Sequence, residues 1–256
     1  MSPETKKTLV VFGATGIQGG SVVKAILSDH IASDQFSIRA ITRDPSKPAA
    51  AALAEQGVEA IKADAEDKDS LRLAFKDAYG VFAVTNFWES LDASAETRQG
   101  KNIVDIAKET NIKHLVWSSL PNVSEILPLI DPAADVGKFV KAILLHPSQS
   151  LNQRFNIAQN FYTIQEIIDT LNNAGVNAQF RIFPKESFKA ALATKGAPAF
   201  LQEAIAQILQ FVAQYGYFGG EDIHHLEEQT ITEPLTSLKE SFSTDPTLAK
   251  LKNQDA

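Results

Sequence analysis

The chain of 256 residues contains no cysteine, and this absence alone removes several classes of protein. Without cysteine there is no disulfide framework, no thiolate metal site and no cysteine nucleophile. Basic residues are also in deficit, because 24 Lys and Arg stand against 31 Asp and Glu and leave a net charge of −7. Binding to nucleic acid phosphates requires clustered lysines and arginines, so we expect no direct nucleic-acid binding.

Long hydrophobic runs are absent as well, since no stretch approaches the roughly 18 apolar residues of a membrane span. The apolar run after Lys6-Lys7 is short and leads directly into a glycine-rich turn, unlike a signal peptide. Hydrophobic residues still make up 44% of the chain, which is enough for a full core. We therefore expect a folded protein without a membrane segment, in the cytoplasm or the nucleus.

Short β-branched runs alternate with helical stretches over the first half of the chain. Near-continuous apolar strands in such an alternation indicate a parallel sheet covered on both faces by helices. The pattern predicts an α/β fold, a doubly wound Rossmann-type parallel sheet. We expect strands at 8–12, 36–41, 58–63, 81–85 and 114–118, and helices at 17–30, 48–56, 69–78 and 93–110.

The alternation ends after Leu120, and a smaller, mainly helical C-terminal region is expected to follow. Pro121, Pro128 and Pro132 indicate a loop. Thr163 and Glu166 have the spacing of a capping box at the start of a helix. We expect domains at 1–125 and 126–256, with helices at 136–145, 163–174, 199–215 and 235–242, strands at 154–158 and 179–183, a turn at 215–220 and a frayed tail from 244. The helix at 199–215 is expected to bury one apolar side, which carries Phe200, Leu201, Ala204, Ile208, Phe211 and Val212.

The sequence GATGIQGG lies between the first expected strand and the first expected helix. In this context Gly13 permits a tight exit from the strand, and Gly16 lets the backbone approach a pyrophosphate. Gly19 permits close packing of the helix on the strand. The negative charge of a bound nucleotide would meet unpaired N–H groups at the positive end of the helix. The spacing is G-x-x-G-x-x-G rather than the more usual G-x-G-x-x-G.

Arg43 follows the second expected strand, where an NAD site carries an acidic residue and an NADP site an arginine. A guanidinium can pair in bidentate fashion with the 2′-phosphate of NADP, so we favour NADP(H) over NAD(H). Asp44 is a competing feature, because it could cap the next helix or pair with Arg43. Lys47 could add a further positive charge or simply be solvated.

Four motifs together resemble the NmrA-like family, atypical relatives of the short-chain dehydrogenases that bind NADP. They are GATGIQGG, AITRDPSKPAAAALAEQGVEAIKADAED, VFAVTNFWES and HLVWSSLPNVS, and the resemblance covers about Leu9 to Val123. It resumes from about Pro128 to Ser241 with LIDPAADVGKFVKAILLHP, FYTIQEIIDTL, FVAQYGYFGG and ITEPLTSLKE. Some members of that family are redox-sensing regulators and others are NADPH-dependent reductases.

The resemblance implies roles for particular residues. Thr15, Gly16, Ile17 and Gln18 would contact the pyrophosphate, and Arg43 the 2′-phosphate. Asp64 and Ala65 would border the adenine, while Thr85, Asn86 and Phe87 would line the ribose or nicotinamide end. Phe87 and the neighbouring Trp88 could equally be ordinary packing residues. With the glycines, the expected cofactor-binding set is Gly13, Thr15, Gly16, Ile17, Gln18, Gly19, Arg43, Asp64, Ala65, Thr85, Asn86 and Phe87.

The chain departs from the family pattern between Val123 and Pro128. In the family the fifth strand leads into a helix that carries a lysine, then into a sixth strand and a loop beside the substrate pocket. Here NVSEI continues directly into LPLIDPAAD. At about 30 residues per βαβ unit, more than one strand–helix unit is absent. The C-terminal region is thus expected to be truncated, and losing a sixth strand would expose a sheet edge.

Catalytic residues are not assigned, because the Tyr-x-x-x-Lys pair of short-chain dehydrogenases is missing. The residues four positions after the four tyrosines are Ala83, Glu166, Gly219 and Glu221, and none of the five histidines precedes a lysine at that spacing. Ser118 and Ser119 stand where the catalytic serine usually lies, but without partners they favour cofactor contact or loop capping. His224-His225 indicates a solvated acidic helix rather than a metal site.

Two functions therefore remain open. A redox-sensing module would bind NADP(H) and signal to a protein partner through its C-terminal region. Alternatively, an NADPH-dependent oxidoreductase would reduce a quinone or carbonyl compound, because hydride transfer to a quinone needs little acid catalysis.

Overall fold

The computed structural model describes residues 5–118, 126–180, 184–215, 231 and 233–252. These residues divide into two compact units, each with its own contacts. Unit 1 takes the described residues within Met1–Ser119, Pro132–Arg154 and Leu226–Glu233, and unit 2 those within Leu120–Asp131, Phe155–His225 and Pro234–Ala256. The assignment of a cofactor role to residues 1–125 and of a substrate or partner role to 126–256 remains a prediction.

Unit 1 is built on a parallel sheet of five strands in the order β3-β2-β1-β4-β5. Its central strand β1 contains Leu9, Val10 and Val11, which are completely buried because helices cover both faces of the sheet. The doubly wound fold predicted from the sequence is confirmed. The strands are β1 (Lys7–Val11), β2 (Phe36–Thr42), β3 (Glu59–Lys62), β4 (Gly80–Ala83) and β5 (His114–Trp117).

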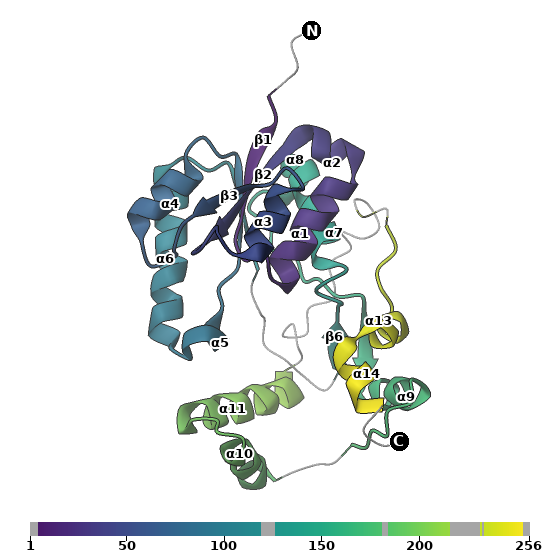
Figure 1. Cartoon of the computed structure of the whole chain (residues 1–256). Coiled ribbons are helices and arrows are strands. Elements are labelled where there is room, and N and C mark those ends of the chain that lie inside the picture. The colour runs from purple at the N-terminus through teal and green to yellow at the C-terminus, as the bar shows by residue number, and fades with distance from the viewer. Residues whose placement is uncertain (1–4, 119–125, 181–183, 216–230, 232, 253–256) are drawn as a thin grey trace. The chain divides into compact units, whose positions relative to one another are not determined.

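Helices lie on both sides of this sheet, with α4 and α6 on one side and α1, α3 and α7 on the other (Figure 1). Phe75 of α4 and Ile103 and Ile106 of α6 pack with alternate residues of β1 and β4 in one buried cluster. The helices of unit 1 are α1 (Ile17–Ser28), α2 (His30–Gln35), α3 (Pro48–Ala54), α4 (Lys68–Phe75), α5 (Phe87–Ser90), α6 (Ala93–Glu109), α7 (Val136–Leu145) and α8 (Pro147–Ser150).

Helices α1 and α7 approach each other closely at Gly137. A Cβ atom added at Gly137 would lie 2.0 Å from the carbonyl oxygen of Ser21, so no larger residue fits there. The Gly137 amide donates a buried hydrogen bond of 2.9 Å to the Ser21 hydroxyl. Segment 132–154 therefore belongs to unit 1 although it follows the break in the strand–helix alternation.

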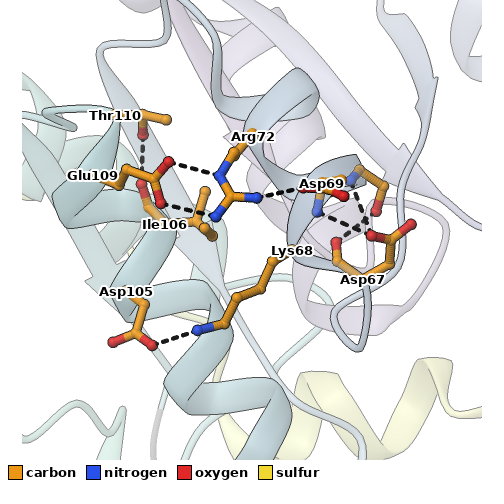
Figure 2. Close-up of polar contacts among 9 residues, drawn as sticks. Asp67, Lys68, Asp69, Arg72, Asp105, Ile106, Glu109 and Thr110 are labelled. Carbon is orange, nitrogen blue, oxygen red and sulfur yellow. Dashed lines mark hydrogen bonds and ion pairs between the residues drawn. The ribbon is translucent and has the colours of Figure 1, made fainter.

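Charged side chains join the outer surfaces of α4 and α6 (Figure 2). Lys68 pairs with Asp105 at 2.7 Å, and Arg72 donates to both carboxylate oxygens of Glu109 at 2.6 and 3.2 Å. Arg72 also contacts Asp69 on its own helix. Because the partnered groups are half exposed, this surface aligns two helices and adds little stability per pair.

Unit 2 consists of a two-stranded antiparallel sheet and helices. The capping box predicted at the start of α9 is confirmed, since the Thr163 hydroxyl and the Glu166 carboxylate each accept a bond from the other's backbone amide. Its elements are β6 (Ile126–Leu129), β7 (Asn160–Thr163), α9 (Ile164–Asn173), α10 (Lys185–Thr194), α11 (Ala199–Tyr215), α13 (Leu238–Thr244) and α14 (Pro246–Lys252).

Several C-terminal predictions are wrong. The segment expected as a proline loop contains β6, which pairs with β7, whereas the strand expected at 154–158 is absent. The tail expected to fray from Thr244 contains α14, because the Asp245 carboxylate caps the backbone amides of Thr247 and Leu248. Gln179 and Phe180 lie outside any strand, while residues 181–183 and 216–220 of the expected strand and turn fall outside the described residues.

Helix α11 has the predicted bounds but not the predicted buried side. Leu201 and Ala206 are buried, whereas Phe200 and Ile208 are about half exposed. The side chains of Phe211 and Val212 lie outside the described part. In the described part of the chain no helix is long and apolar enough to cross a membrane.

Candidate functional site

The turn between β1 and α1 is held by its own backbone. Gly13 has φ +61°, a left-handed conformation that glycine adopts without strain. Its carbonyl oxygen accepts a hydrogen bond of 2.8 Å from the Gly16 amide, and the Gly16 carbonyl accepts one of 2.9 Å from Gly20. The chain thus leaves the strand and enters the helix within a few residues.

Gly19 allows α1 to lie directly against the end of β1. A Cβ atom added there would lie 2.3 Å from the Gly13 carbonyl oxygen and 2.4 Å from that of Phe12. At Gly20 an added Cβ would lie 3.4 Å from the nearest atom, an ordinary contact. The third glycine of the motif is therefore required by backbone packing, whereas the fourth is not.

The first turn of α1 lacks the groups that usually satisfy a helix N-terminus. Its N-cap residue is Gly16, which has no side chain to accept a hydrogen bond, and its first turn contains no acidic residue. Asp67, Asp92 and Thr163 cap α4, α6 and α9, whereas α3, α5, α7, α8 and α10 resemble α1 in having no side-chain cap. Thr15, Gly16 and Ile17 are exposed, and this turn lies at the positive end of the helix. This is the arrangement that binds anions.

Four of the predicted binding segments lie at the same edge of the sheet. Residues 13–19, 43, 64–65 and 85–87 follow β1, β2, β3 and β4, and all these strands are parallel. The order of the strands reverses between β1 and β4, which is where ligands bind in open α/β sheets. An added Cβ at Gly13 would lie 3.4 Å from Val84, so the two loops at this switch point are neighbours.

Arg43 is 64% exposed, and its guanidinium forms an ion pair with Glu89 of α5. Asp44 neither caps helix α3 nor pairs with Arg43. Its carboxylate accepts hydrogen bonds from the Ser46 hydroxyl at 2.6 Å and the Ser46 amide at 3.0 Å. These bonds, led by that of the hydroxyl, lower the pKa of Asp44 below its ordinary value. Lys47 is exposed and is the N-cap residue of α3.

The predicted binding residues that follow β3 and β4 form hydrogen bonds with neighbouring helices. The Asp64 amide donates to the Ser70 hydroxyl of α4 at 3.0 Å, and the Ala65 carbonyl accepts from Asn102 of α6 at 2.9 Å. The Thr85 hydroxyl donates to Glu96 of α6 at 2.6 Å. Asn86 is exposed, and Phe87 begins α5. The ligand contacts expected of these residues remain predictions.

A hydrogen bond between β5 and the glycine turn was not predicted. The Ser118 hydroxyl donates to the Gln18 side-chain oxygen at 2.7 Å, across 100 residues of sequence. This bond occupies the side-chain acceptor of Gln18 and leaves its side-chain NH2 group available to donate to a ligand. Gln18 and Ser118 lie in separate sequence motifs, and nothing local in the sequence links them.

Of the two tyrosines whose side chains are described, Tyr79 belongs to unit 1 and Tyr162 to unit 2. Tyr79 precedes β4 at the opposite edge, where its ring contacts Phe36, His114 and the ammonium of Lys7. Tyr162 belongs to β7 and donates to Gln159. His114 is buried at the start of β5, and this burial lowers its pKa.

The NmrA-like family model matches residues 5–130 and 121–245, two stretches that share ten positions and together cover most of the chain. The chain belongs to the NmrA-like family. The resemblance inferred from the four motifs is therefore confirmed. The absence of a central segment stays a prediction.

A curated relative agrees with this membership. The chain is 37% identical over 127 residues to the NmrA-like family domain-containing oxidoreductase hkm9 of Aspergillus hancockii, a match over 48% of this chain and 37% of that protein. The matched part thus spans little more than a third of that relative's length.

Two solved structures have the same fold. The NADPH complex of the quinone oxidoreductase QOR2 of Escherichia coli matches with TM-score 0.70 and 17% identity over 95% of this chain and 99% of that one. The NADP complex of NmrA, a negative transcriptional regulator, matches with TM-score 0.69 and 14% identity over 99% of both chains. At such low identity the likeness concerns the fold alone.

Proposed function

We propose that this NmrA-like protein binds NADP(H) at the turn 13–19 and acts as a redox-sensing regulatory module. The observation that carries the proposal is the exposed glycine turn, which has no side-chain cap and leads into α1 at the topological switch point. The bound cofactor would supply or accept a hydride at its nicotinamide ring. The chain's own residues orient it and set which nucleotide is accepted.

Arg43 is the group that would distinguish NADP(H) from NAD(H). It follows β2, as expected for recognition of the 2′-phosphate, and its guanidinium can form two parallel bonds with phosphate oxygens. The NADPH complex of QOR2 and the NADP complex of NmrA support NADP(H) as a cofactor, but NmrA is also known in complex with NAD, so the proposed preference rests on Arg43.

A sensing role is favoured over catalysis because a proton donor is missing from the described site. The hydroxyls of Thr85, after β4, and Ser118, after β5, already donate to Glu96 and Gln18. The sequence also contains no lysine four residues after any tyrosine. Reversible binding of the cofactor requires none of these groups.

Isothermal titration of the purified chain with NADPH, NADP⁺ and NADH tests the proposal. We expect saturable binding of NADPH and NADP⁺ to the wild type and weaker binding of NADH. Gly19→Ala should abolish binding, because its Cβ would overlap the Gly13 carbonyl, whereas Gly20→Ala should bind like the wild type. If none of the three nucleotides binds the folded wild type, the proposal is wrong.

The second candidate function is that of an NADPH-dependent oxidoreductase acting on a quinone or carbonyl compound. It is favoured by the name of the relative hkm9, an oxidoreductase, and by the fold shared with a quinone oxidoreductase. Steady oxidation of NADPH in the presence of a panel of quinones would support catalysis. Intact binding without turnover across that panel would favour the sensing role.

A further inference from the structure

The guanidinium of Arg43 already has an anionic partner in the protein. Its Nη1 atom pairs with Oε1 of Glu89, and the side chains are 64% and 48% exposed. Arg43 follows β2, and Glu89 belongs to α5, which follows the loop after β4. A 2′-phosphate and Glu89 would therefore compete for the same guanidinium.

The ion pair joins loops from strands that are not neighbours. Strand β1 lies between β2 and β4, so the pair connects the two sides of the glycine turn. With neighbouring strands about 4.8 Å apart, β2 and β4 are separated by roughly 10 Å. Arg43 stands at the expected adenosine end of the cofactor, and α5 directly follows Asn86 at the expected nicotinamide end.

We propose that Glu89 is a specificity-determining latch, whose carboxylate holds Arg43 and α5 together until a 2′-phosphate takes its place. This inference rests on the proposed NADP(H) binding at the same edge of the sheet. When a 2′-phosphate binds Arg43, Glu89 loses its partner and α5 is released. NADH carries no 2′-phosphate and leaves the pair closed. Recognition at the adenosine end is thereby coupled to the loop at the nicotinamide end.

The structure of α5 makes such a release measurable. This helix is a single turn, closed by the Leu91 amide bonded to the Phe87 carbonyl at 2.8 Å and followed by Leu91 at φ +53°. The Glu89 amide bonds to the Asn86 carbonyl at 3.3 Å. Exchange of these two amides with solvent reports whether the turn stays formed.

The first experiment compares Glu89→Gln with the wild type by calorimetry. Removing the competing carboxylate should tighten NADPH binding about five-fold, the upper range for an exposed ion pair, and leave NADH binding within a factor of two. Glu109→Gln is the matched control, since it makes the same charge change and breaks an ion pair with Arg72 at the far end of α6. In an Arg43→Gln background, Glu89→Gln should no longer alter NADPH affinity.

The second experiment measures hydrogen exchange of residues 86–92. Adenosine 2′,5′-bisphosphate, which carries only the adenosine end and the 2′-phosphate, should accelerate exchange in α5, whereas 5′-AMP should not. The latch is wrong if exchange in α5 does not change with adenosine 2′,5′-bisphosphate. It is also wrong if Glu89→Gln raises the affinities for NADPH and NADH equally. If NADPH binds the wild type, but Glu89→Gln has the same ratio of NADPH affinity to NADH affinity as the wild type, only the latch is wrong. If no nucleotide binds any variant, the proposed function and the latch both fail.

Discussion

At the scale of single residues, Arg43 is expected to determine whether NADPH or NADH binds more tightly. Replacing it with glutamine removes the bidentate phosphate partner and leaves Glu89 facing the cofactor. We expect Arg43→Gln to weaken NADPH binding by about 10- to 100-fold and NADH binding by less than two-fold, measured by calorimetry. Arg72→Gln makes the same charge change away from the site and should alter neither. An equal loss of affinity for NADPH and NADH would contradict the assignment of Arg43 to the 2′-phosphate.

The residues of the glycine turn were predictable because their roles follow from local spacing. A strand, three glycines at fixed intervals and a helix suffice to predict the tight exit from the strand at Gly13 and the close packing at Gly19, which the structure shows as a left-handed Gly13 and a close backbone approach at Gly19. The bond between Ser118 and Gln18 and the pair between Arg43 and Glu89 were not predictable. Both join segments distant in sequence, and their formation depends on the order of strands in the sheet.

At the scale of elements, the contact between α1 and α7 depends on Gly137. Gly137→Ala places a Cβ 2.0 Å from the Ser21 carbonyl, and the helices must separate to accommodate it. Overpacking of this kind costs about 2–3 kcal/mol, which urea unfolding of the variant should measure. Gly20→Ala, also within a helix but with room for the methyl group, should change stability by less than about 1 kcal/mol. Equal stability of the two variants would contradict the close packing.

Elements were predictable where their signals were local, as in β1 to β5 and the capping box of α9. Strand β6 was missed because it contains Pro128 and forms only by pairing with β7, more than 30 residues later. Helix α14 did have a local signal, since Asp245 caps it and Pro246 occupies its first position. The buried side of α11 depends on what it packs against and was not predictable from its own periodicity.

A pair of lysines on α10 holds Glu203 of α11. Bonds from Lys185 and Lys189 lower the pKa of Glu203 from its ordinary value of 4.5 to about 2. A lowered carboxyl pKa stabilises the folded state above pH 4.5, and the contribution is lost as the pH falls from 4.5 toward 2. We expect Glu203→Gln to lower the melting temperature at pH 7, with the difference from the wild type shrinking as the pH falls below 4.5 and disappearing only below about pH 2. A difference independent of pH would contradict this origin.

At the scale of the whole molecule, the sensing role requires that cofactor binding in unit 1 alter unit 2. We expect NADPH to slow hydrogen exchange in β1, α1 and β4 and also to change it in α9, α10 and α11. The same experiment with 5′-AMP should leave unit 2 unchanged. Protection confined to unit 1 would favour the oxidoreductase over the sensor.

The central claim is that the turn between β1 and α1 holds the diphosphate of NADP(H). A crystal structure of the chain grown with saturating NADPH tests it most directly. We expect the diphosphate within hydrogen-bond distance of the backbone amides of Thr15, Ile17 or Gln18, with the 2′-phosphate beside Arg43. NADPH bound elsewhere, or a turn without nucleotide under these conditions, would contradict the account.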